Sequence, residues 1–66
     1  MNQYDDTYKN VLSNLVSQRL KAGLKQTVVA RKLQVSQPTI SRIENGKRAL
    51  TYRHYLILSS LYTAKE

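Results

Sequence analysis

Residues 26–48 read QTVVARKLQVSQPTISRIENGKR, and this stretch carries the clearest signals of secondary structure in the chain. Apolar residues recur at helical spacing in both of its halves. Between the halves, Ser36 is a residue type that begins helices, and Pro38 falls where a first helical turn tolerates a missing N–H. Gly46 is the residue type that most often ends a helix. The stretch therefore predicts two short helices joined by a tight turn, at about residues 26–33 and 37–45.

Apolar residues also recur at helical spacing before and after residues 26–48. Six upstream apolar residues form one stripe: Tyr8, Val11, Leu12, Leu15, Val16 and Leu20. N-cap residue types stand before this stripe, at Asp5, Asp6 and Thr7. Gly23 is expected to end the first helix, and Thr51 to begin a last helix that runs to Tyr62. The sequence predicts a compact all-α fold of four helices.

The composition limits what so small a chain can do. It has 66 residues, no cysteine and one histidine, so disulfides, thiolate metal sites and histidine-based catalysis are not expected. The prediction is one domain over residues 1–66, in which 1–6 form an N-terminal arm and 63–66 a tail that could lack order. We expect no enzyme activity, no cofactor, no metal and no small-molecule ligand. The N-terminus carries no secretory signal and the longest apolar run is four residues, which favours a cytoplasmic protein.

The positive charge points to a polyanionic partner. Eleven basic residues stand against four acidic ones, a net charge of +7, which suits nucleic acid or an anionic membrane. Between Lys25 and Arg53 there are seven basic residues and one acidic residue, Glu44. A solvated face usually mixes the two signs, whereas phosphate neutralisation needs one sign. The distribution favours nucleic acid, although plain solubility remains an alternative for Arg31 and Lys32.

The second of the two short helices has two unlike edges. At 100° per residue, Ile40 and Ile43 share one edge. The other edge carries Pro38, Ser41, Arg42 and Asn45, with Gln37 on the flank near the helix N-terminus. Gln and Asn can pair with adenine and Arg with guanine, and the methylenes of Pro38 or Thr39 suit a thymine methyl. Two short helices followed by a basic loop are the layout of a helix-turn-helix, while an ordinary solvated face is the alternative for this helix taken alone.

The same residues resemble a known family. Gln26 opens the first short helix, Ala30 lies on its inner face, Val35-Ser36 forms the turn, and Ile40-Ser41-x-Ile43-Glu44-x-Gly46 follows, with basic residues after it. This run strongly resembles the Cro/repressor-type (xenobiotic-response-element-like) helix-turn-helix family, which includes phage repressors, restriction–modification controller proteins and many antitoxins. The resemblance covers about Val11 to Leu61. It implies a lambda-repressor-like domain of four helices, or five, because many relatives add one.

The resemblance also implies residue roles. Base edges are contacted from Gln37, Ser41 and Arg42, to which Pro38 is added for its methylenes. Phosphates are contacted from Lys25, Gln26, Asn45, Lys47 and Arg48, and Gln26 also steadies Gln37. Arg19 and Glu44 match a partly buried salt bridge between the first and third helices. Two residues depart from the family pattern: Lys25 stands where Ser or Thr usually caps a helix, and Gln34 where Gly is common.

These observations predict a sequence-specific regulator of transcription that binds double-stranded DNA. The expected form is a small phage- or plasmid-type Cro-like repressor that binds a palindromic operator as a homodimer, at the nucleoid. A controller protein, or an antitoxin that binds DNA and a protein partner, is the alternative. The tyrosines of the last helix either form the dimer surface or fill the core. A membrane partner is not expected, because the apolar stripes and glycine helix ends suit helices that pack on one another.

Overall fold

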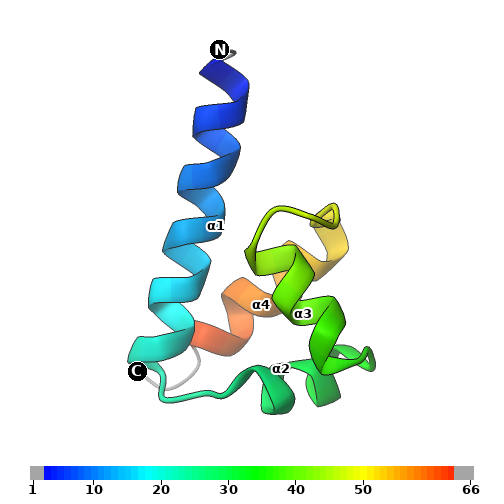
Figure 1. Cartoon of the computed structure of the whole chain (residues 1–66). Coiled ribbons are helices and arrows are strands. Elements are labelled where there is room, and N and C mark those ends of the chain that lie inside the picture. Colours follow the sequence, from blue (N-terminus) through cyan, green and yellow to red (C-terminus); the bar gives the residue numbers. More distant parts are fainter. Residues whose placement is uncertain (1–2, 64–66) are drawn as a thin grey trace.

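The chain folds into helices joined by short connections (Figure 1). The computed structural model describes residues 3–63, with side chains from Asp6 onward. In this part there are four helices and no strand: α1 (Gln3–Lys21), α2 (Gln26–Leu33), α3 (Gln37–Glu44) and α4 (Tyr52–Thr63). The predicted all-α class with four helices is confirmed. No helix in this range is long and apolar enough to cross a membrane.

The first three helices end in the same backbone motif. In each, an N–H beyond the helix returns to a carbonyl of its last turn: Leu24 to Arg19 at 3.1 Å, Val35 to Ala30 at 2.9 Å and Lys47 to Arg42 at 2.8 Å. The motif requires one residue in the left-handed region, and these are Gly23 (φ 73°), Gln34 (φ 60°) and Gly46 (φ 76°). Glycine adopts this conformation freely, whereas Gln34 places a Cβ there at a steric cost.

The helix starts differ in how their first N–H groups are satisfied. The Ser36 hydroxyl oxygen accepts a backbone N–H of α3 at 3.3 Å, and Pro38 lies in the first turn of that helix. The Thr51 hydroxyl oxygen accepts a backbone N–H of α4 at 3.1 Å. Lys25 precedes α2 in extended backbone and makes no side-chain cap bond. The start of α2 is therefore weaker than the starts of α3 and α4.

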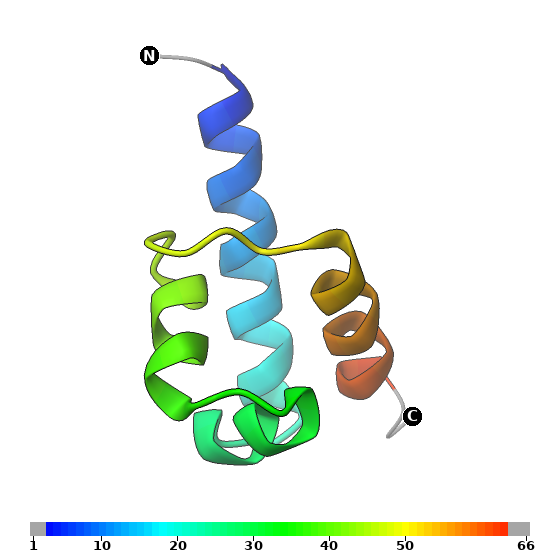
Figure 2. The same ribbon diagram turned by 90° about the vertical axis from the view of Figure 1, so that its right-hand side faces the viewer.

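The core lies where the four helices meet. Its buried members are Leu15, Val29, Ala30, Leu33, Ile40, Leu58 and Tyr62. α3 and α4 each pack against α1 and α2 rather than against each other, and Figure 2 shows them on opposite sides of α1. This arrangement leaves the outer edge of α3 uncovered by the rest of the described fold.

Two predictions about the chain ends need correction. α1 begins at Gln3, so residues 3–6 of the predicted arm belong to this helix. Acidic residues favour a helix from within its first turn as well as from its cap, because carboxylates interact favourably with the positive helix N-terminus. At the other end, α4 includes Thr63, and the remaining predicted tail at 64–66 lies outside the described residues, as do residues 1–2.

The stripe predicted on α1 is wider than the face that is buried. Leu12, Leu15 and Arg19 are buried, at spacings of three and four residues along one edge. Leu20 lies about 100° further round the helix and is 62% exposed. The assignment of Leu20 to the buried stripe is therefore wrong, because Arg19 occupies the inward position at this turn.

Candidate nucleic-acid interface

α3 turns one edge toward the core and the other outward. Ile40 and Ile43 are buried, whereas Gln37, Pro38 and Arg42 are exposed and Ser41 is half-buried. Ser41 is also bonded along the helix, because the Asn45 amide donates to its hydroxyl at 3.4 Å. The residues predicted to read bases therefore lie together on one open face of a short helix.

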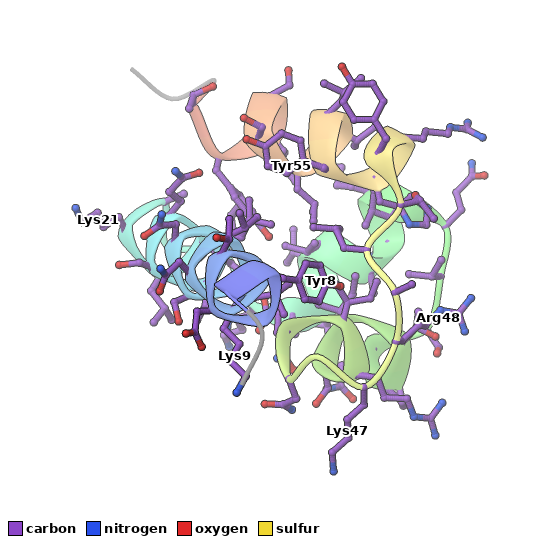
Figure 3. All side chains as sticks on the ribbon, turned by 90° about the horizontal axis from the view of Figure 1, so that it is seen from above. Tyr8, Lys9, Lys21, Lys47, Arg48 and Tyr55 are labelled. Atoms are coloured by element: carbon purple, nitrogen blue, oxygen red, sulfur yellow. The ribbon has the colours of Figure 1, made fainter. Side chains whose placement is uncertain are left out.

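The residues predicted to contact phosphates lie around this face. Lys25 is exposed at the start of α2, and Asn45, Lys47 and Arg48 are exposed in the loop after α3. Figure 3 shows the side chains of Lys47 and Arg48 projecting away from the body. Their backbone is fixed, since both N–H groups donate to the Arg42 carbonyl, at 2.8 and 3.2 Å. The loop therefore presents its two cations from a defined position.

A further cation, from α1, was missed by the sequence reasoning. Figure 3 shows Lys9 pointing to the same side of the molecule as Lys47. Lys9 lines a pocket of about 530 Å³, together with Ser13 of α1 and Asn45 of the loop after α3. No motif marks Lys9 in the sequence, because only the packing of α1 beside α3 brings it to this face.

An ion pair lies behind the face, between α1 and α3. Arg19 Nε donates to Glu44 Oε2 at 2.7 Å, and Arg19 Nη2 donates to Glu44 Oε1 at 3.2 Å. The two side chains are only 10% and 12% exposed. Arg19 Nη1 donates to the Leu24 carbonyl at 2.8 Å. The two-point geometry is that of a strong charge-assisted pair, and it ties α1 to α3.

Tyr62 of α4 lies near enough to this pair to respond to both charges. Its side chain is buried, and burial raises the pKa of Tyr62 from 10.0 to about 12. The negative charge of Glu44 adds to the rise in pKa, and the positive charge of Arg19 opposes it. A neutral phenol therefore stands beside the ion pair at neutral pH.

Two glutamine side chains connect the ion pair to the outer edge of α3. Gln26 Nε2 donates to Glu44 Oε1 at 2.8 Å, and Gln37 Nε2 donates to Gln26 Oε1 at 2.7 Å. Arg19, Glu44, Gln26 and Gln37 thus form one continuous series of hydrogen bonds, which we call the polar network. The bond between Gln26 and Glu44 was missed by the sequence reasoning, because a separation of 18 residues carries no signal of contact.

The chemistry of this face is that of binding. Amide and guanidinium groups on α3 match the donors and acceptors of base edges, and the surrounding cations match phosphate oxygens. Within residues 3–63, no group of three or more His, Cys, Asp or Glu is placed to hold a metal ion. The face is therefore suited to reading one groove of a duplex while neutralising the backbone on either side.

Comparison with known proteins identifies the family. Residues 15–63, which include α2, α3, α4 and part of α1, match the family model described as Helix-turn-helix. The chain belongs to the Cro/C1-type helix-turn-helix family and has a lambda-repressor-like fold. It is a DNA-binding regulator of transcription. Comparison with curated proteins and with solved structures gave no match.

Proposed function

We propose that the chain is a small phage- or plasmid-type Cro-like repressor that binds a palindromic operator as a homodimer. α3 of each subunit lies in the major groove, and bound protein blocks transcription by occupying the operator, in the cytoplasm at the nucleoid. The observation that carries this proposal is the outer edge of α3, where Gln37 and Arg42 are exposed between cations from two other segments. An α-helix fits the major groove, and its outward side chains then face base edges.

The proposal divides the site residues into two groups. Gln37, Pro38, Ser41 and Arg42 read base edges, and Lys25, Gln26, Asn45, Lys47 and Arg48 contact phosphates. Gln26 supports both groups, because one hydrogen on its amide nitrogen bonds Glu44 and the second is available to a phosphate oxygen. Lys9 adds a phosphate contact from α1, on the side to which Lys47 points.

α4 offers a surface for the second copy. Tyr52 is 76% exposed and Leu56 is 48% exposed. Leu56 also lines a groove of about 510 Å³ together with Ile57 and Leu61. Exposed aromatic and aliphatic side chains in one patch are typical of protein interfaces. A body of 35 × 26 × 19 Å is small enough for a dimer to place its two α3 helices one DNA turn, roughly 34 Å, apart.

Selection of binding sequences from a pool of random duplexes, at two salt concentrations, tests the proposal. We expect an enriched palindrome whose half-sites lie one helical turn apart. Affinity should fall as salt rises, because phosphate contacts release counterions. Sedimentation of the complex should give two subunits per operator. Recovered duplexes that share no motif would exclude base reading, and one subunit bound to a single half-site would exclude the dimer.

A further inference from the structure

The polar network joins the most buried cation of the site to the first residue of α3. The two glutamine bonds run in the same direction, since Gln37 donates to Gln26 and Gln26 donates to Glu44, which accepts from Arg19 on its other side. At the inner end, Glu44 is fixed by two donors of Arg19, whose third nitrogen is held by the Leu24 carbonyl. The carboxylate therefore cannot rotate without losing bonds that are nearly closed to water.

The charge of Glu44 sets the direction of the whole network. A carboxylate has acceptors only, so Gln26 must turn its amide nitrogen inward to meet it. The oxygen of the same amide then faces outward and requires a donor. Gln37 supplies this donor from its own amide nitrogen, whose Nε2 lies 2.7 Å from Oε1 of Gln26. One acid in the interior thus fixes the orientation of two amides.

The orientation of Gln37 decides what it presents to DNA. With one hydrogen of its nitrogen committed to Gln26, it retains one N–H donor and a free carbonyl oxygen. This combination of donor and acceptor matches adenine, which offers N7 as acceptor and N6 as donor in the major groove. In the reverse orientation the oxygen of Gln37 would bond Gln26, and two N–H donors would face the groove. Two donors match the two acceptors of guanine, N7 and O6.

We propose that Glu44 is a specificity-determining residue: by accepting from Gln26, it holds Gln37 in the orientation that reads adenine and rejects guanine. Glu44 touches no base and acts through the two glutamines. This proposal rests on the proposed function, because it requires that α3 enters the major groove. It assigns to the salt bridge a role in base choice beyond joining two helices.

The test substitutes Glu44→Gln, which preserves shape but supplies an amide nitrogen toward Gln26. Preference is measured by competition between operators that carry A or G at the base pair where Gln37→Ala has its effect. We expect this preference for adenine to fall by about tenfold, the size of one bidentate base contact. Preference at the base pair read by Arg42 should not change.

A second variant, Gln26→Met, keeps the salt bridge and breaks the network at its middle. It should lower the preference for adenine at the same base pair by a similar factor, and combining it with Glu44→Gln should add nothing there. If Glu44→Gln does not fold, Gln26→Met still tests the link through which Glu44 acts, because unchanged preference in this variant would overturn the inference. Tyr8→Phe is the matched control, since it removes a hydrogen bond of 3.0 Å to the Leu50 N–H, away from the network, and should leave base preference unchanged.

A second readout needs no DNA. Nuclear magnetic resonance of the free protein should show the side-chain amide signals of Gln37 shifted by Glu44→Gln and by Gln26→Met, and unshifted by Tyr8→Phe. Unchanged preference in both network variants, or an equal loss at every base pair, would overturn the inference while the proposed function stands. A base other than adenine at the position of Gln37 would overturn it too. If the wild-type protein selects no sequence, the proposed function fails, and the inference fails with it.

Discussion

Gln34 stands in a conformation that side chains with a Cβ avoid. It ends α2 with φ 60° and ψ 42°, in the position that glycine holds at the ends of α1 and α3. The left-handed region costs an L-residue roughly 1–2 kcal/mol relative to the right-handed one. The turn between α2 and α3 is therefore held by the hydrogen bonds around it rather than by the preference of the residue in it.

Gln34→Gly should stabilise the protein. We expect the free energy of unfolding in urea to rise by about 0.5–1 kcal/mol, because relief of the steric cost exceeds the greater backbone entropy of glycine in the unfolded chain. Gln34→Ala is the control, since it removes the side chain beyond Cβ and keeps the left-handed strain. An equal gain from both variants would show that the side chain, not the backbone, is unfavourable.

Arg42 and Lys47 should differ in how their loss affects DNA binding. Arg42→Ala should cost about 1–3 kcal/mol and relax preference at one or two operator positions, because we propose that its guanidinium pairs with a base edge. Lys47→Ala should weaken binding to every sequence and lower the salt slope by about one, as expected for a single phosphate contact. Both are measured by titration of matched and mismatched duplexes. Equal loss on all duplexes for Arg42→Ala would exclude base reading by this residue.

At the level of helices, the sequence predicted boundaries best where a single clear residue signal marked each end of the helix. The predicted range 26–33 is that of α2, and 37–45 exceeds α3 by one residue. The start of α1 was placed too late, since three candidate caps follow one another and nothing before them breaks a helix. Contacts between helices were harder to predict from the sequence. The hydrogen bond from Gln26 to Glu44 depends on the angle at which α2 and α3 pack, and no local sequence pattern encodes this angle.

Lys25→Ser should raise the stability of the fold and lower the affinity for DNA. The backbone of Lys25 already has the extended conformation of an N-cap, φ −84° and ψ 156°, but its side chain makes no cap bond. A serine hydroxyl can accept from the first turn of α2, so the free energy of unfolding should rise by about 1 kcal/mol. Loss of the positive charge should lower the salt slope of DNA binding by about one.

Lys21→Ser serves as the matched control, because it removes an exposed positive charge from the last turn of α1 without creating a cap. Urea denaturation and salt-dependent DNA titration measure the two effects. A gain in stability from Lys21→Ser as large as that from Lys25→Ser would attribute the gain to charge reduction instead of capping.

At the scale of the whole molecule, the surface of α4 should control the number of subunits on the operator. Leu56→Ser should weaken dimer formation and reduce affinity for the full palindrome by about tenfold, because burial of an exposed leucine at an interface contributes roughly 1–2 kcal/mol. Affinity for a single half-site should not change. Leu20→Ser is the control, since Leu20 is more exposed than Leu56 and lies on α1. Sedimentation would contradict the α4 interface if both variants dimerise like the wild type.

The fold should lose stability in alkaline solution through Tyr62. Its pKa is about 12 in the folded protein and 10.0 when unperturbed, so the folded state favours the neutral phenol. Stability is complete below about pH 10 and falls as the pH rises toward 12, because the unfolded chain releases this proton first. The loss is about 3 kcal/mol at most, since each unit of pKa difference corresponds to about 1.4 kcal/mol. Denaturation in guanidinium chloride across this range should show the loss in the wild type and in Tyr52→Phe, and a smaller loss in Tyr62→Phe.

The two edges of α3 also bear on how such a regulator can evolve. Ile40 and Ile43 support the fold from the inner edge, so Arg42 on the outer edge is free to mutate without loss of folding. Gln37 has less freedom, because its partners reach back through Gln26 to the interior. Substitutions that change which operator is bound should therefore arise first at Arg42. The base opposite Gln37 should be the slowest to change, since a new residue there would require compensating changes inside the protein.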